Sequence, residues 1–296
     1  MIGAVVVDGV LIAAVLSLAS LGLSLSYAVF RFPNFAHADL LTIGAFAAWS
    51  GATLAGGNAA PMLSLAAGAA AALVTCAGVI LLADRLVLRA LLARRQSASV
   101  IIAAFAIGLL LRNVLVLIFG PGEVALDRDI EIARPVMLLP GLSAGRLTAT
   151  ESGVILATAL LLAGLHIFLR HSPTGRDLRA VAEDPDLAGL SGLVVPRIRV
   201  LAWGLCGAFC AAAGLAILML GPAQPETGSE YMLPALAAVV VGGLGSIWGM
   251  LAGALLIGLV ESVTVHVGLA EWREVTAFAL VVLVLFLRPA GLFGRA

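Results

Sequence analysis

Lysine is absent from this chain of 296 residues, so all 17 of its basic residues are arginines. A Walker A loop needs a lysine to reach the nucleotide phosphates. Retinal proteins and pyridoxal phosphate enzymes need a lysine to form a Schiff base. The chain is therefore not a conventional P-loop ATPase, a rhodopsin or a pyridoxal phosphate enzyme. If ATP drives its activity, another polypeptide must hydrolyse that ATP.

Charged residues of both signs are also scarce. They make up 11% of the chain, against about 25% in a typical soluble domain. Hydrophobic residues make up 62%, and the mean hydropathy is +1.13. This composition predicts a polytopic membrane protein. The net charge is zero, so the composition indicates neither nucleic acid nor an acidic substrate as a partner.

Cysteine occurs only at Cys76, Cys206 and Cys210, each within an apolar run. Cys206 and Cys210 are four residues apart and would share one face of a helix, which makes a metal-binding pair conceivable. Two thiols form an incomplete metal site without a histidine or carboxylate nearby, and the sequence places none beside them. We therefore expect small buried side chains, with no disulfide framework and no metal.

Apolar runs recur along the whole chain, and a full membrane span needs about 20 such residues. Two of the runs are short or interrupted, and their places in the two halves suggest an internal repeat. The sequence predicts an all-α polytopic membrane protein, a single domain over residues 1–296 with about eight transmembrane helices, short or broken segments included. The predicted full spans are Val5–Val29, Pro61–Ala83, Ser97–Phe119, Gly153–Phe168, Val200–Leu220, Met250–Val267 and Val275–Leu287, and the short runs are Leu40–Leu54 and Met232–Val241.

The arginines predict the orientation, because cytoplasmic loops of membrane proteins are enriched in basic residues. Two arginine-rich segments, Asp84–Gln96 and Arg170–Arg199, are separated by two spans, so both can face the cytoplasm. Gly120–Ser152 lies between them, is richer in carboxylates and carries several prolines and glycines, so we expect an external, irregular loop. The C-terminal arginines then lie inside. The N-terminus lacks arginine, falls outside and begins a retained helix rather than a cleaved signal peptide.

A polar interruption, RFPNFAHADLLTIG, stands before the first short run. Pro33 lacks a backbone N–H and disfavours helix at the preceding residue. Irregular backbone at membrane depth occurs only where it lines a cavity or is buried in protein. One interpretation is a pathway-lining break with polar contacts from Asn34, His37 and Asp39. The other, equally open, is a plain cytoplasmic loop in which Asp39 caps a helix.

The second short run is followed by GGLGSIWGMLAG, residues 242–253. Its glycines either open a helix or let two helices approach closely, and Gly249 and Gly253 have the small-residue spacing of packed membrane helices. We expect packing, with a substrate-facing break as the alternative. An intramembrane Ser–His protease using Ser246 and His266 is conceivable. However, Ser246 lacks the following glycine of rhomboid-type proteases.

The charged segment Arg170–Arg199 is too long for a simple turn. Leu178–Leu190 predicts one short surface helix, and we interpret the segment as a docking surface for a soluble partner, since loops of this length are usually functional. Two isolated ionisable residues lie inside spans. Arg112 is expected to extend outward to the membrane surface rather than line a pathway. Glu261 is expected to bond to a neighbouring helix.

Four stretches carry a resemblance: FPNFAHADLLTIGAF from Phe32, GRDLRAVAEDPDLAGLSGL from Gly175, AVVVGGLGSIWGMLAGALLIGLVES from Ala238, and the C-terminal RPAGLFG. With them the chain resembles the permease subunits of branched-chain amino-acid ABC importers, the LivH type, from about Leu16 to Gly294. Ala38 departs from the family, which usually carries glycine there, and this change bears on the identity of the substrate.

The resemblance implies a permease subunit in the bacterial inner membrane that carries branched-chain or related amino acids, with no enzymatic activity, cofactor or metal. Its implied partners are a sister permease or second copy, two cytoplasmic ATPase subunits and a periplasmic solute-binding protein. The implied pathway residues are Asn34, Phe35, His37, Asp39, Gly242, Gly243, Gly245 and Ser246. The implied ATPase-coupling residues are Arg176, Arg179, Glu183, Asp184, Gly189 and Gly192.

Two alternatives stay open. The same machinery can carry urea, short amides or another small polar solute. Less in keeping with the resemblance, the chain can be an ion-coupled secondary transporter that uses Asp39 and Glu261.

Overall fold

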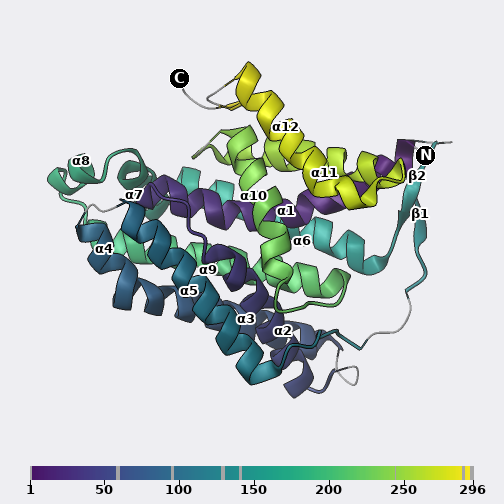
Figure 1. The fold of residues 1–296 in the computed structure, drawn as a ribbon, viewed down its shortest axis with the longest axis horizontal. Helices are drawn as coiled ribbons and strands as arrows, with labels where there is room; N and C mark the ends of the chain where they lie inside the picture. Colours follow the sequence, from purple (N-terminus) through teal and green to yellow (C-terminus); the bar gives the residue numbers. More distant parts are fainter. Residues whose placement is uncertain are drawn as a thin grey trace.

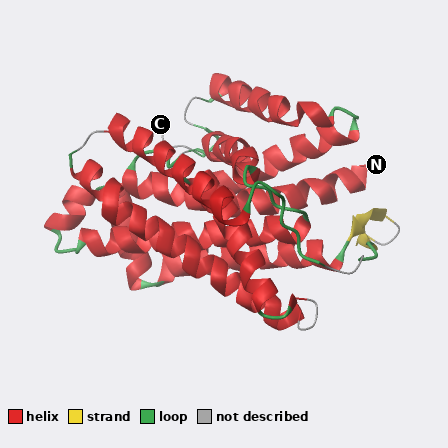
Figure 2. Cartoon of the chain, turned by 60° about the horizontal axis from the view of Figure 1, so that its bottom comes forward, coloured by secondary structure: helices red, strands yellow, loops and turns green. Residues whose placement is uncertain are grey.

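The computed structural model of the chain describes residues 2–57, 61–94, 97–127, 131–139, 142–243, 245–288 and 291–293. Arg95 of the segment Asp84–Gln96, Pro140 of the loop Gly120–Ser152 and the C-terminal Arg295 lie outside these ranges. Helices form most of the described chain (Figure 2). They are α1 Ile2–Phe30, α2 His37–Leu54, α3 Pro61–Ala83, α4 Arg89–Ala93, α5 Ser97–Phe119, α6 Ala149–His171, α7 Pro173–Glu183, α8 Pro185–Leu190, α9 Val195–Leu220, α10 Thr227–Gly242, α11 Ile247–His266 and α12 Arg273–Leu287, with a π-helical turn at Asp84–Leu88 and a 3-10 turn at Ala270–Trp272.

Each predicted apolar run corresponds to one of these helices, and the all-α polytopic class is confirmed. Among the described residues, six helices are long and apolar enough to cross a membrane: α1, α3, α5, α6, α9 and α11. The short runs are α2 and α10. Helix α12 has 15 residues, about 22 Å at 1.5 Å per residue, against a hydrocarbon core of about 30 Å. The number of crossings therefore stays a prediction.

Helix α1 is the central element of the bundle. It packs against α11, α9, α10 and α6, and its second half is almost wholly buried. Small residues allow this close packing. At the contact with α11, a Cβ added to Gly258 would lie 2.6 Å from the Gly9 carbonyl oxygen. Helices α3, α5 and α6 instead bury only about a fifth of their most apolar windows, so their outer faces suit a lipid environment.

The predicted irregular loop 120–152 is partly regular. Strands β1 (Arg134–Leu139) and β2 (Leu142–Leu147) form an antiparallel hairpin, with register irregularities in β1. The hairpin lies beside the N-terminal end of α1 (Figure 1). Pro135 and Gly145 both lie within the paired strands, so the expectation of purely irregular structure is wrong for this part.

The two arginine-rich segments lie at the same end of the molecule. Figure 1 places α4, α7 and α8 together at one end, and the N-terminus and the hairpin at the opposite end. This arrangement is what the arginine distribution requires if both segments face the same side of the membrane. The assignment of that side to the cytoplasm stays a prediction.

Candidate functional site

The interruption after α1 returns the chain to half-depth in the bundle. Helix α1 ends at Phe30, and Arg31 adopts a positive φ of 60° that turns the backbone sharply. The next helix, α2, begins at His37, whose Nε2 lies 2.7 Å from the carbonyl oxygen of Ala19. Ala19 is about 16 Å from the end of α1 at 1.5 Å per residue. Helix α2 therefore starts in the interior, and the interpretation of a plain surface loop is wrong.

Asn34 lies inside this interruption with its side chain fully buried. Neither the amide nitrogen nor the amide oxygen of that side chain has a hydrogen-bond partner among the described residues. A buried unpaired amide costs about 1–3 kcal/mol, so such a group calls for an explanation. Phe35 beside it is half-buried. The amide therefore keeps an unused donor and an unused acceptor in the protein interior.

The second short helix, α10, meets the first turn of α2. It follows a break that contains Pro222 and Pro225. The backbone N–H of Gly228 donates to the hydroxyl of Thr42 at 2.9 Å. A Cβ added to Gly228 would lie 1.8 Å from the carbonyl oxygen of Ala38. The first turns of two interrupted helices are thus in direct backbone contact, which neither helix pattern alone predicted.

We expect Gly228→Ala to prevent stable folding, because the added methyl cannot fit against the backbone of α2. The expected loss in free energy of unfolding is at least about 3 kcal/mol, the upper range for overpacking. The measurement is the yield and thermal midpoint of the purified protein in detergent. Gly221→Ala is the matched control, since Gly221 has an extended backbone and open space around its Cβ position. Equal yields of both variants would contradict the close contact.

Asp39 forms an ion pair that bridges α2 to α5. Its Oδ1 accepts from Arg112 Nε at 2.8 Å, and an Arg112 Nη2 also donates to the hydroxyl of Ser229 in α10. Asp39 is buried and Arg112 is about a quarter exposed. The expectation that Arg112 extends to the membrane surface is therefore wrong. An isolated buried carboxylate is costly, so Arg112 compensates a charge that would otherwise be unpaired in the interior.

In the glycine segment 242–253, some glycines allow two helices to pack closely and others form the break between α10 and α11. Backbone atoms of Gly242 and Gly249 are so close that a Cβ on either would lie within about 2.2 Å of the other residue. This bears out the packing expectation. Gly243 and Gly245 have positive φ angles of 104° and 83° and end α10, while Ser246 caps α11 by accepting from Gly249 N–H at 3.1 Å. A pathway role for these residues stays a prediction.

The protease interpretation is excluded by distance. Ser246 and His266 lie at opposite ends of α11, about 30 Å apart along a 20-residue helix. A Ser–His dyad requires hydrogen-bond contact.

The predicted single surface helix Leu178–Leu190 is two helices, α7 and α8. Asp184 separates them because its carboxylate accepts from the N–H groups of Asp186 and Leu187, each at 2.9 Å, and so caps α8. Leu178 and Val181 are buried against the bundle. All six predicted coupling residues are exposed, namely Arg176, Arg179, Glu183, Asp184, Gly189 and Gly192.

Exposed leucines accompany these charges. Leu187 is 61% exposed and Leu190 is 87% exposed. Arg31 connects this surface to the interruption before α2, since its guanidinium donates to the carbonyl oxygens of Ala182 and Glu183 at 2.8 and 2.9 Å. A cation at the C-terminal carbonyls of a helix is favourable. Sequence reasoning missed this role for Arg31, because nothing local indicates a partner that is so distant in the chain.

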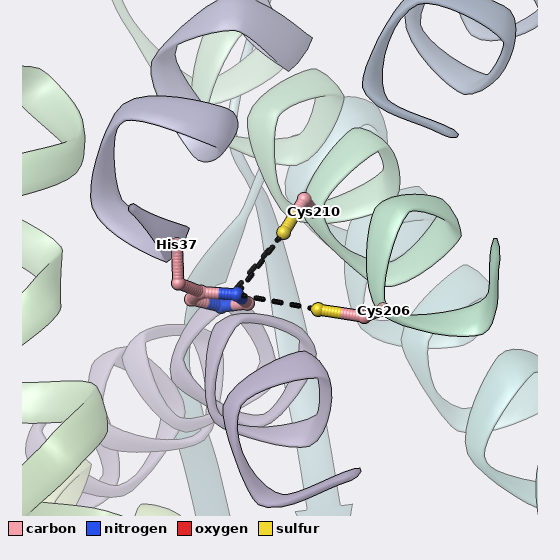
Figure 3. Close-up of side chains that lie close together, drawn as sticks. All are labelled: His37, Cys206 and Cys210. Atoms are coloured by element: carbon pink, nitrogen blue, oxygen red, sulfur yellow. Dashed lines mark hydrogen bonds between the residues drawn. The ribbon is translucent and has the colours of Figure 1, made fainter. Parts of the chain in front are cut away.

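The three side chains of His37, Cys206 and Cys210 lie together in the interior (Figure 3). The expectation that no histidine lies near the thiol pair is therefore wrong. The sequence shows the thiol spacing, but only the packing of α2 on α9 supplies the imidazole.

Glu261 lies in α11 beside a cavity of about 110 Å³ whose polar lining also includes Glu230, Tyr231 and Arg273. Arg273 in α12 is its ion-pair partner, with Nε 4.0 Å from Glu261 Oε2. Glu261 Oε1 has no hydrogen-bond partner among the described residues. The expected bond to a neighbouring helix is thus a long ion pair.

Comparisons with known proteins show which family and which relatives the chain matches in sequence. The family described as branched-chain amino acid transport system / permease component matches residues 5–285. The high-affinity branched-chain amino acid transport system permease protein LivH of Escherichia coli is 30% identical over 97% of this chain and 94% of its own length. BraD of Pseudomonas aeruginosa, with the same description, is 29% identical over 98% and 94%. The ribose import permease protein RbsC of Haemophilus influenzae is 37% identical over 39% of this chain and 38% of its own.

Proposed function

The chain belongs to the branched-chain amino acid transport system / permease component family, and from this premise we propose that it carries branched-chain or related amino acids through a bacterial inner membrane. In this proposal it pairs with a sister permease or a second copy. Two cytoplasmic ATPase subunits supply the energy, since this lysine-free chain has no Walker A loop. A periplasmic solute-binding protein delivers the substrate.

The observation that carries the proposal is the meeting of the two interrupted helices. The first turns of α2 and α10 are in contact at half-depth, where Gly228 N–H donates to Thr42. Helix N-termini carry partial positive charge, and interrupted helices with converging N-termini are typical of sites that hold an anionic group within a membrane. In this proposal the carboxylate of an amino acid lies beside these N-termini and not between them, because the contact at Gly228 leaves no room there. The unpaired amide of Asn34 is available in the same interruption.

The α7–α8 surface supplies the coupling in this proposal. The ATPase subunit docks on the exposed charges and leucines of residues 173–192. Arg31 connects this surface directly to the interruption before α2, because it bonds to Ala182 and Glu183 and is itself the residue where the chain turns. Closure of the ATPase pair would thereby displace the start of α2 and expose the site to alternate sides.

A second candidate is the same machinery with another small polar solute, such as urea or a short amide. It is favoured by the amide of Asn34, which pairs with neutral polar groups as readily as with charges, and by the partial match to a ribose permease. The ion-coupled alternative is weakened by the pairing of Asp39 with Arg112. A carboxylate held by an arginine is not free to bind an ion in transit.

The test is uptake by proteoliposomes that contain the purified importer with both permeases, the ATPases and ATP inside. We expect accumulation of leucine, isoleucine or valine that requires the binding protein and ATP. Competition by unlabelled urea, acetamide and ribose identifies the solute class. Accumulation by this chain alone under an ion gradient would refute the proposal. Accumulation of urea or an amide in preference to amino acids would select the second candidate.

A further inference from the structure

A compact cluster of nitrogen and sulfur donors lies at the start of α2. His37 Nδ1 is 3.2 Å from Cys210 Sγ and 3.8 Å from Cys206 Sγ, and all three ligand atoms lie within 4.8 Å of one another. Each of the three residues is fully buried. Figure 3 shows the two sulfurs directed at the same edge of the imidazole ring from successive turns of α9.

The imidazole is held so that its donor atom faces the sulfurs. His37 Nε2 is 2.7 Å from the carbonyl oxygen of Ala19 in α1. A carbonyl only accepts hydrogen bonds, so Nε2 carries the proton and Nδ1 of the neutral ring carries the lone pair. A histidine ligand in a metal site almost always donates its other N–H to a carbonyl or carboxylate in this way. The arrangement is thus that of a pre-oriented ligand.

We propose that His37, Cys206 and Cys210 bind a single thiophilic d10 cation, Zn(II) or Cu(I). Bonds of about 2.0–2.1 Å to nitrogen and about 2.3 Å to sulfur put tetrahedral nitrogen and sulfur ligands about 3.6 Å apart. The observed separations of 3.2 and 3.8 Å lie on either side of this value. Thiolate and imidazole together select Zn(II) and Cu(I) over harder cations.

The charge balance suits a buried site. Zn(II) displaces one proton from each thiol, both protons pass to water, and two thiolates with a neutral imidazole give an uncharged complex. Zn(II) takes a water molecule as its fourth ligand. Cu(I) displaces one proton and is neutral with one thiolate, one thiol and the imidazole as three donors. Neither complex leaves an uncompensated charge in the apolar interior.

A bound cation would join three helices. His37 is the first residue of α2, the two cysteines belong to α9, and the Nε2 bond reaches α1. The metal would therefore tie the start of α2 to α9 and α1, so that these segments move together when α2 is displaced. Because it binds the folded state in preference to the unfolded chain, it should also raise thermal stability.

The test is the metal content of the purified importer complex from cells grown with zinc sulfate or, separately, copper sulfate under reducing conditions. We expect on the order of one cation per copy of this chain, and elemental analysis of the two preparations distinguishes Zn(II) from Cu(I). In the variants Cys206→Ala and Cys210→Ala, the bound metal per chain should fall at least tenfold. The rise in thermal midpoint caused by the metal should disappear with it. Cobalt(II) added to metal-free protein should give thiolate absorption bands only in the unsubstituted site.

Cys76→Ala is the matched control. Cys76 is equally buried, but its Sγ donates to the carbonyl oxygen of Leu40 at 3.4 Å and is not part of the donor cluster. This variant should keep its metal. Two results would overturn the proposal. One is a wild-type complex that contains no metal from either culture. The other is equal metal content in the wild type and in the Cys206 and Cys210 variants. A monodisperse size-exclusion profile of each purified variant in detergent verifies its fold. Neither a partner subunit nor a transport assay is needed for this check, so failure here is separate from failure of the proposed transport function.

Discussion

Arg112→Ala is expected to destabilise the protein by about 3 kcal/mol, the low end of the cost of removing one partner from a buried ion pair. Asp39 remains buried in this variant without its guanidinium partner, which donates from Nε at 2.8 Å. The bond to Ser229 is lost at the same time, so the connection among α2, α5 and α10 weakens. The measurements are the thermal midpoint in detergent and uptake by the reconstituted importer, both of which should fall.

The control for Arg112→Ala is a double-mutant cycle with Asp39→Asn. Removing the charge of Asp39 relieves the uncompensated carboxylate, so the double variant should be more stable than Arg112→Ala alone, with a coupling energy of about 1–3 kcal/mol. If the stability loss of the double variant equals the sum of the two single-variant losses, the pair does not interact in the folded protein. Asn113→Ala is a matched control on α5, since this exposed side chain bonds only to Leu109 of its own helix among the contacts the structure describes.

Leu190→Glu is expected to reduce ATP-driven uptake at least tenfold while leaving the permease folded. Leu190 is 87% exposed on α8, so the substitution costs little within the chain itself. In the proposed complex the ATPase subunit covers this leucine, and burying it there contributes about 1.5–3 kcal/mol. A carboxylate in its place removes that contribution and adds a desolvation cost. The expected result is at least a tenfold loss of ATPase subunit retained on the purified permease.

Ile132→Glu is the matched control for Leu190→Glu. Ile132 is 86% exposed, so the change in chemistry and exposure is nearly the same, but the residue lies just before the β hairpin. This hairpin is at the opposite end of the molecule from α8 (Figure 1). The variant should retain the ATPase and its ATP-driven uptake. Equal retention of ATPase by Leu190→Glu and the wild type would refute docking at α8.

The helices themselves were predictable because their signals are local. Long apolar runs require helical backbone in a membrane, where every N–H and C=O must be paired within the segment. The run Ser97–Phe119 matches α5 at both ends, and Pro33 correctly predicted that the chain breaks before α2. The charged residues after α6 correctly predicted a surface segment, although the capping of α8 by Asp184 divides it into two helices.

By itself the sequence determined a helical membrane protein with two interrupted segments and without the lysine of a Walker A loop, since both features can be read along the chain without knowing how the helices pack. Only the tertiary structure decided which distant residues meet. Arg112 was expected at the surface but pairs with Asp39, and His37 joins two cysteines. Apolar periodicity specifies that a helix is buried, whereas the partner of a buried polar group depends on how whole helices cross.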